Sequence, residues 1–300
     1  MFDVTVIGNV GIDTNIYYGD GLDSRVESNF TENIDCIGQA GGYASRGFAR
    51  LGLNTAFIGF IGNDANGRFI KDVFNDDGIN TEGLYIDHAG TNRSINFMYR
   101  DGRRKNFYDG KSHMTLLPDL EKCRTILHAS RLVHFNIPNW ARRLLPIARE
   151  CGAKISCDIQ DVTDVYDPYR QDFINHADII FFSCVNHASP QPIIESLLKL
   201  NSNLTIVAGM GVRGCALGTV KGIQFFEAIE LDAPVVDTNG AGDSLAVGFL
   251  SSYIIDGYSP QDSVLRGQIA ARYVCTLKAN SDHLITRRQL DEYFKRYKKQ

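Results

Sequence analysis

The stretch Asp237-Thr238-Asn239-Gly240-Ala241-Gly242-Asp243-Ser244 is the most informative part of the chain. It leads into an apolar run over 245–254 whose spacing is close to the helical period, so we expect a loop followed by the start of a helix. Small residues at such a junction let main-chain N–H groups converge on an anion, and the helix dipole adds positive potential. The sequence therefore predicts an anion-binding turn whose natural occupant is a phosphate group.

Asp243 stands out in this turn because a carboxylate repels phosphate. In a phosphoryl-transfer enzyme, such a carboxylate accepts the proton of the attacking hydroxyl group. In a structural turn, it is simply one of the acidic residues that the first turn of a helix favours. The local chemistry leaves both interpretations open.

The rest of the chain alternates short apolar, β-branched runs with stretches of helical pattern. We expect buried strands over 4–7, 55–58, 132–135, 154–157, 178–182 and 204–208, and helices over 43–51, 66–75, 140–151 and 192–200. This alternation favours an α/β fold with a parallel sheet that has helices on both faces. Ligands of such sheets bind at the carboxyl ends of the strands, so site residues are expected just after the strands.

Two polar segments, residues 14–36 and 90–110, interrupt this alternation. Both have the pattern of exposed antiparallel strands or hairpins, the second turning at Asp101-Gly102. They fit either ordinary surface hairpins or a small β lid that pairs over the edge of the sheet. Lid strands with an apolar face would leave a surface for a second copy of the chain, which predicts a homodimer formed through the lid.

The composition excludes several classes of protein. The 300 residues include 31 Lys and Arg against 35 Asp and Glu, without a basic stripe, so we expect no nucleic-acid partner. No apolar run approaches the ~18 residues of a membrane span, and strand-like sequence follows Met1 directly, so we expect no membrane partner and no signal peptide. The 7 widely spaced cysteines predict reduced thiols in a cytoplasmic protein.

Residues 209–214 match the pattern G-x-G-x-x-G of dinucleotide-binding sites. That motif requires a helix immediately after it. Residues 215–220 and 221–226 have instead the pattern of two strands around a turn. We therefore interpret this match as part of a hairpin and not as the cofactor site of a dehydrogenase.

The motif Asp-Thr-x-Gly-Ala-Gly-Asp over 237–243 resembles the C-terminal signature of the ribokinase/PfkB family of carbohydrate kinases. Residues 38–52 and the motif Gly-x-x-Gly-x-Asp-x-x-Gly over 59–67 resemble the N-terminal signature, and the order of elements agrees over nearly the whole chain. The resemblance implies a ribokinase-like three-layer α/β/α fold with a mostly parallel central sheet and a small β lid. It also implies that residues 1–300 form a single kinase domain.

The resemblance implies an ATP-dependent kinase that uses Mg²⁺, and in some relatives K⁺, to phosphorylate a hydroxyl group of a sugar or sugar-like small molecule. The expected catalytic residues are Asp243 as general base and Gly240, Ala241 and Gly242 as anion hole. The expected substrate-binding residues are Asp13, Gly38, Gln39, Tyr43 and Asn136. The expected nucleotide-binding residues are Ser183, Gly211, Arg213 and Gly214. Two positions match metal sites, a monovalent-cation site at Asp237 and a water-mediated Mg²⁺ contact at Asn186.

Two alternatives remain beside this expectation. One is a nucleoside kinase of the same family, in which Tyr43, Phe97 and Tyr99 would stack on a base. The other is a non-catalytic regulator that binds a sugar or a nucleotide on the same fold. The cluster Arg100, Arg103, Arg104 and Lys105 fits either a phosphorylated sugar or a solvated turn.

The chain departs from the family pattern at four of these positions. Gln39 stands where the family usually has Gly, which is tolerated without strain if its backbone avoids the region that Gly favours. Tyr43 replaces a common Asn, so we expect a changed sugar pocket. Ser183 and Asn186 replace the ends of an Asn-x-x-Glu motif, so we expect weaker Mg²⁺ binding in an enzyme that still works.

Overall fold

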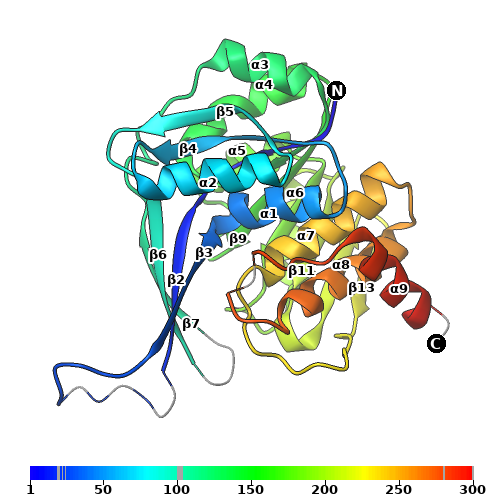
Figure 1. The fold of residues 1–300 in the computed structure, drawn as a ribbon. Helices are drawn as coiled ribbons and strands as arrows, with labels where there is room; N and C mark the ends of the chain where they lie inside the picture. Colours follow the sequence, from blue (N-terminus) through cyan, green and yellow to red (C-terminus); the bar gives the residue numbers. More distant parts are fainter. Residues whose placement is uncertain (19–20, 22, 24, 100–103, 280, 299–300) are drawn as a thin grey trace.

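The computed structural model describes residues 1–18, 21, 23, 25–99, 104–279 and 281–298. Within these ranges, nine strands form a central sheet in the order β13-β12-β11-β10-β9-β8-β1-β4-β5 (Figure 1). The strands are β1 Phe2–Ile7, β4 Thr55–Gly62, β5 Asn80–Asp87, β8 Ser130–Phe135, β9 Lys154–Asp161, β10 Ile179–Ser183, β11 Thr205–Gly209, β12 Cys215–Thr219 and β13 Gly222–Phe226. The β11–β12 and β12–β13 pairs are antiparallel and the other pairs are parallel, which confirms the mostly parallel sheet.

Helices cover both faces of the sheet, which confirms the three-layer fold (Figure 1). One face carries α1 Gln39–Arg50, α2 Ala65–Asp76, α7 Ala241–Leu250, α8 Pro260–Val274 and α9 Arg287–Tyr297. The other face carries α3 Leu120–His128, α4 Leu145–Glu150, α5 Pro168–His176 and α6 Gln191–Leu200. Large fully buried side chains fill both cores, among them Phe48 and Phe249 on the first face and Trp140 and Phe173 on the second.

In the described ranges, no helix is both long and apolar enough to cross a membrane.

The predicted helix over 140–151 is two elements in the structure. A 3₁₀ helix, Asn139–Leu144, precedes α4, in which Pro146 occupies the first turn. Proline suits this position because its fixed φ is helical and its missing N–H would lack a partner there. The helical pattern was read correctly, whereas the change of helix type within it was not predicted.

The glycine motif over 59–67 connects the central sheet to α2 and contacts the segment that leads into the lid. Asp64 caps α2 by accepting a hydrogen bond from the N–H of Gly67 at 2.8 Å. The same carboxylate accepts from the N–H and the hydroxyl of Thr91, at 2.8 and 2.6 Å. A Cβ at Gly67 would lie 2.0 Å from the carbonyl oxygen of Gly62, so this close approach requires glycine.

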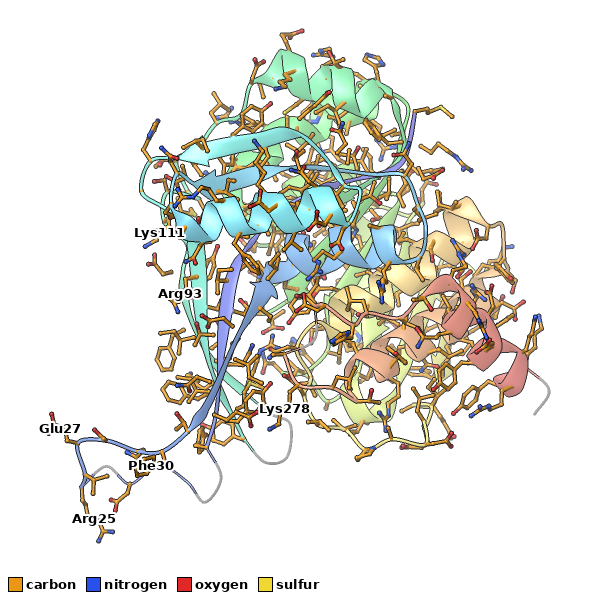
Figure 2. All side chains as sticks on the ribbon, viewed as in Figure 1. Arg25, Glu27, Phe30, Arg93, Lys111 and Lys278 are labelled. Atoms are coloured by element: carbon orange, nitrogen blue, oxygen red, sulfur yellow. The ribbon has the colours of Figure 1, made fainter. Side chains whose placement is uncertain are left out.

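The two segments expected to form a lid do pair into a separate sheet, in the order β3-β2-β6-β7 (Figure 1). Its strands are β2 Gly11–Tyr17, β3 Glu32–Gly38, β6 Asn92–Met98 and β7 Arg104–Asp109. The expected antiparallel pairs are β2–β3 and β6–β7, whereas the central β2–β6 pair that joins the two segments is parallel. The part of the β2–β3 connection that carries Arg25, Glu27 and Phe30 extends away from the body of the molecule (Figure 2). Expected lid residues 19–20, 22, 24 and 100–103 lie outside the described residues.

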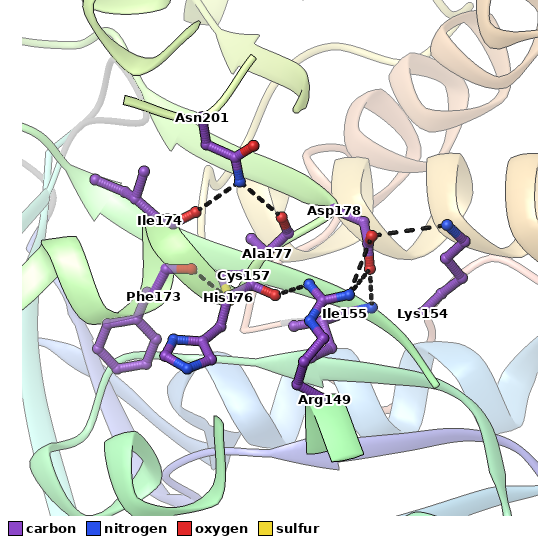
Figure 3. A network of polar contacts seen from close by, with 10 residues as sticks. All are labelled: Arg149, Lys154, Ile155, Cys157, Phe173, Ile174, His176, Ala177, Asp178 and Asn201. Carbon is purple, nitrogen blue, oxygen red and sulfur yellow. Dashed lines mark hydrogen bonds and ion pairs between the residues drawn. The ribbon is translucent and has the colours of Figure 1, made fainter. Parts of the chain in front are cut away.

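Polar contacts join the amino ends of β9 and β10 (Figure 3). These ends lie at the edge of the sheet opposite to the carboxyl ends of the strands. Asp178, just before β10, accepts a hydrogen bond from the N–H of Ile155 at 2.8 Å and pairs with Arg149 at 3.3 Å. Asn201 donates to two carbonyl groups at the end of α5, both at 3.2 Å. These contacts fix the register of the strands whose far ends carry site residues.

A buried arginine joins the C-terminal helices. Arg266 of α8 is 0% exposed, and its guanidinium donates to Ser252 at 2.7 Å and to Asp291 at 2.8 Å. Ser252 belongs to a π-helical turn, Ser251–Ile255, that follows α7. The guanidinium also lies over the rings of Tyr258 and Phe294, at 4.7 and 5.1 Å from their centroids. Arg266 therefore links α7, α8 and α9.

We predict that Arg266→Ala lowers the free energy of unfolding by about 3–5 kcal/mol, because it leaves a cavity and removes the partner of Asp291. The measurement is the midpoint of urea unfolding. Arg288→Ala is the matched control, since Arg288 forms an exposed pair with Glu292 and should leave the unfolding midpoint nearly unchanged. Equal midpoints for both variants would contradict the role assigned to Arg266.

Candidate active site

The turn before α7 has the geometry of an anion-binding site. Gly240 is the N-cap of α7 and has a φ of 72°, in the left-handed region that favours glycine. No side chain caps this helix end, so the first-turn N–H groups that lack helical partners are available to a ligand. A Cβ on Gly242 would have no atom within 4 Å, which leaves open space beside those N–H groups.

Asp243 lies in the first turn of α7, partly buried, beside this open space. The pKa of its carboxyl group is raised from 3.8 to about 8, mainly by desolvation and also by the negative charges of Asp158 and Asp13. The positive charge of Arg104 opposes this increase. A carboxylate with a raised pKa binds a proton well, as a general base must.

Asp13 follows the end of β1 closely in sequence and lies on β2 of the lid. It is 6% exposed, and burial raises the pKa of its carboxyl group to about 6. The close packing of this carboxyl group explains Gly38, where a Cβ would lie 2.0 Å from the Cγ of Asp13. The negative charge of Asp13 raises the pKa of Asp243, which indicates that the two carboxyl groups lie near each other.

Gln39 adopts the backbone conformation that its side chain disfavours. Its φ is 67°, so the condition for strain-free replacement of the family's Gly is not met. Its side-chain Nε2 donates to the Oδ1 of Asp13 at 3.1 Å and to the Oγ of Ser94 at 2.7 Å. The amide therefore joins α1 to two strands of the lid.

Two expected substrate contacts are buried. Tyr43 is 4% exposed, and its ring lies against Gly240, where a Cβ would be 2.5 Å from Cδ1 of the ring. Asn136 is 2% exposed, and its side-chain oxygen lies against Gly8. The ring of Tyr43 therefore lies beneath the anion-binding turn, and the expected substrate contacts of Tyr43 and Asn136 stay predictions.

The nucleotide-side residues occupy the adjoining strand ends. Ser183 ends β10 and pairs in register with Gly209 at the end of β11. Gly211 and Gly214 have φ values of 58° and 87° and flank a 3₁₀ turn that leads into β12. Asn186 is exposed in the turn that follows β10.

Arg213 closes a turn in this region. Its guanidinium donates to the carbonyl oxygens of Ala188, at 2.5 Å, and His187, at 3.1 Å. We expected this guanidinium to contact a phosphate group. In the structure it is hydrogen-bonded to main-chain carbonyl groups, as the side chain of a turn residue would be.

Asp237 connects three parts of the chain. Its Oδ2 accepts from the hydroxyl of Tyr17 at 2.6 Å and from the N–H of Ala279 at 3.0 Å, and its Oδ1 accepts from the N–H of Asn239 at 2.7 Å. Lys278 pairs with Glu32 of the lid beside this contact (Figure 2). Both oxygens of Asp237 already have donors, and its expected cation contact stays a prediction.

A row of amide side chains, which the sequence analysis did not identify, joins the lid to the anion-binding turn. Asn106 donates to Asn96 at 2.8 Å, and Asn96 donates to Asn15 at 3.0 Å. Asn239 then donates to Asn15 at 2.8 Å and accepts from Arg104. The spacing of two between Arg104 and Asn106, both on β7, was a signal that these residues share one face.

Asp158 is the second residue that the sequence analysis missed. It lies near the carboxyl end of β9, and burial raises the pKa of its carboxyl group to about 6. It influences the pKa of Asp243, so it faces the same site. The predicted strand over 154–157, followed directly by an acidic residue, was the available signal.

Comparisons with known proteins agree on the family. The family model described as pfkB family carbohydrate kinase matches residues 1–286. Acarbose 7(IV)-phosphotransferase of Actinoplanes sp. is 28% identical over 295 residues, which cover 96% of this chain and 97% of that protein. "Probable fructokinase-3" of Arabidopsis thaliana is 27% identical over 250 residues, 75% of this chain and 71% of that protein. The solved structure of the microbiome-derived acarbose kinase Mak1 has a TM-score of 0.89 at 27% identity and covers 98% of this chain and 99% of its own.

We predict that Asp243→Asn melts at a higher temperature than the wild type at pH 8, by about 2 °C or more, and at the same temperature near pH 4. The folded protein retains a proton on Asp243 up to about pH 8, whereas the unfolded chain loses it near pH 3.8. Wild-type stability therefore falls as the pH rises through this window, and the amide removes that loss. Thermal unfolding measured across the pH range tests this, and a pH-independent difference would contradict it.

Proposed function

The chain belongs to the pfkB family of carbohydrate kinases, and from this premise we propose that it transfers the γ-phosphoryl group of ATP to a hydroxyl group of a sugar or sugar-like molecule, with Asp243 as the general base. We also propose that residues 1–300 act as one kinase domain. The observation that carries the proposal is the position of Asp243. Its proton-binding carboxylate lies in the first turn of a helix whose N-terminal end is open to an anion.

The proposed reaction needs few parts. Asp243 takes the proton of the attacking hydroxyl group, while Asp13 accepts a hydrogen bond from the substrate and orients it. The oxygen then forms a bond to the γ-phosphorus as the bond from that phosphorus to the ADP oxygen breaks. Main-chain N–H groups over 240–242 face the charge of the transferring group.

The residues present fit a Mg²⁺ ion held mainly by ATP. In the described ranges, no group of three or more His, Cys, Asp or Glu side chains is arranged to hold a metal. Mg²⁺ in phosphoryl-transfer sites needs one or two carboxylates beside the phosphates, and we assign that place to Asp158, with Asn186 further out. The ion supplies neutralisation of phosphate charge when bound.

The lid contacts support a closed site. The amide row joins the lid to Asn239, which is the residue directly before the anion-binding turn. A lid held in this position excludes water, which would otherwise compete with the sugar hydroxyl for the phosphoryl group.

The names of the relatives support a sugar-like substrate, since they refer to acarbose and fructose. The nucleoside alternative has less support, because Tyr43 is buried and Phe97 packs against Phe107 on the outer face of the lid. Turnover on a panel of acarbose, fructose, ribose and adenosine discriminates these substrates. Tight binding without turnover would favour the regulator alternative.

We predict that Asp243→Asn lowers kcat by about 10²–10⁴-fold with little change in the binding of ATP, because the proton acceptor is lost. The measurement is steady-state ATP consumption with the substrate that the wild type prefers. Asp262→Asn is the matched control, since Asp262 is an acidic residue in the first turn of another helix. A structural role alone for Asp243 would leave the kcat values of both variants close to that of the wild type.

We also propose that the outer face of the lid pairs with a second copy of the chain. Its apolar side chains Ile95 and Phe107 are 39% and 55% exposed. Arg93 and Asp35 lie 3.9 Å apart on the lid, so this surface carries both charges and can complement itself.

Sedimentation at micromolar concentration should show a dimer for the wild type and a monomer for Phe107→Asp, because the new charge would be buried in the interface. Phe225→Asp is the matched control, since Phe225 is 56% exposed on β13, outside the lid. A monomeric wild type would overturn the dimer and leave the proposed chemistry untouched.

A further inference from the structure

The start of α1 contains a strained backbone at a polar junction. Gln39 has a φ of 67°, in the left-handed region that is unfavourable for a residue with a Cβ. Such strain persists where the surrounding contacts compensate for it, which happens most often in functional sites. The conformation of Gln39 therefore needs a compensating contact.

The compensating contact is the side-chain amide. One nitrogen, Nε2, donates to the Oδ1 of Asp13 on β2 and to the Oγ of Ser94 on β6. These two residues are register partners on the parallel strands at the centre of the lid. Gln39 belongs to α1, which packs on the central sheet, so its amide spans the boundary between the body and the lid.

The contact with Asp13 constrains the carboxylate of that residue. Gly38 packs against this carboxylate, and Gln39 occupies one of its oxygens. A buried carboxylate without such a donor would be more costly to keep charged and freer to rotate. The orientation of Asp13 thus depends on the residue that carries the strain.

We propose that Gln39 is a positioning residue: its strained backbone aims its amide so that, with the lid in place, the Asp13 carboxylate is held in the orientation that receives the substrate hydroxyl group. This inference rests on the proposed function and assigns Gln39 an indirect role in place of the direct substrate contact expected from the sequence. Opening of the lid would separate Ser94 and Asp13 from α1 and release the clamp. Substrate orientation is thereby linked to lid closure.

The experiment compares Gln39→Gly with Gln39→Ala. Both variants lose the amide, so both should raise KM about 10-fold or more with a smaller effect on kcat. They differ in strain, because only glycine favours a positive φ. Gln39→Gly should therefore melt about 2 °C above Gln39→Ala, whereas glycine in an ordinary helical position melts lower than alanine.

Lys111 provides the matched control, because it has a φ of 50° and lies outside the site. Lys111→Gly should also melt above Lys111→Ala, but neither variant should change KM. In contrast, unchanged KM values for the Gln39 variants would overturn the positioning role, and a lower melting temperature for Gln39→Gly than for Gln39→Ala would overturn the strain.

The pH dependence of kcat/KM provides a readout that packing alone would not change. The Gln39 side-chain amide is one of the donors that lower the pKa of Asp13, so the acidic limb of the profile should move to higher pH in both Gln39 variants. The main-chain N–H of Gln39 and the hydroxyl of Ser94, which also lower this pKa, stay in place. The other charged or titratable groups that interact with Asp13 stay in place: Arg104, Asp243, Cys36, Tyr43 and Tyr108.

A wild type without turnover on the panel would contradict the proposed function. The clamp would then be tested separately by the two melting comparisons and by the stabilisation that acarbose or fructose gives each variant. Equal stabilisation of the wild type and the Gln39 variants by a sugar that binds would overturn the clamp. If no sugar stabilises the wild type or the variants, the melting temperatures of Gln39→Gly and Gln39→Ala are compared. A lower melting temperature for Gln39→Gly would then overturn the strained backbone on which the clamp depends.

Discussion

The desolvation of Asp243 is the constraint on which the site depends. A carboxyl group in water would lose its proton near pH 3.8, and its partial burial beside Asp158 and Asp13 holds that proton until about pH 8. This placement costs folding stability at neutral pH, because the folded chain must either keep the proton or bury the charge. The same placement gives the carboxylate its affinity for a proton. The chain thus accepts a local loss of stability at the residue that we propose as the general base.

Packing around Gly240 holds the glycine turn before α7 in place. The Tyr43 ring leaves no room for a side chain at Gly240, so the left-handed turn and the aromatic support require each other. Tyr43, one of the departures from the family pattern, therefore lies beneath the glycine turn before α7. The departure has a structural explanation, which the type of residue alone did not reveal.

The strands of the central sheet, the three layers and the glycine turn before α7 were predictable, because hydrophobic periodicity and glycine spacing are local signals. α3, α5, α8 and α9 were not predicted, and α5 has a weak pattern because it buries little beyond Phe173 and Ile174. The contacts between distant segments were also missed. Asn15, Asn96, Asn106 and Asn239 meet through the pairing of β2 with β6, and nothing within one segment shows that pairing. Similarly, the strain at Gln39 is a property of the lid contacts and not of its neighbours in sequence.

The carboxylate of Asp237 has a consequence for how ligands influence one another. One of its oxygens receives both the Tyr17 hydroxyl of the lid and the N–H of Ala279, in the segment after α8. Movement of the lid or of the segment after α8 therefore changes the same pair of hydrogen bonds. Any ligand that favours one geometry of this junction therefore biases the other side as well, and thermodynamic reciprocity requires the influence to be equal in both directions. The two reactants of a kinase would then not bind independently, even without direct contact between them.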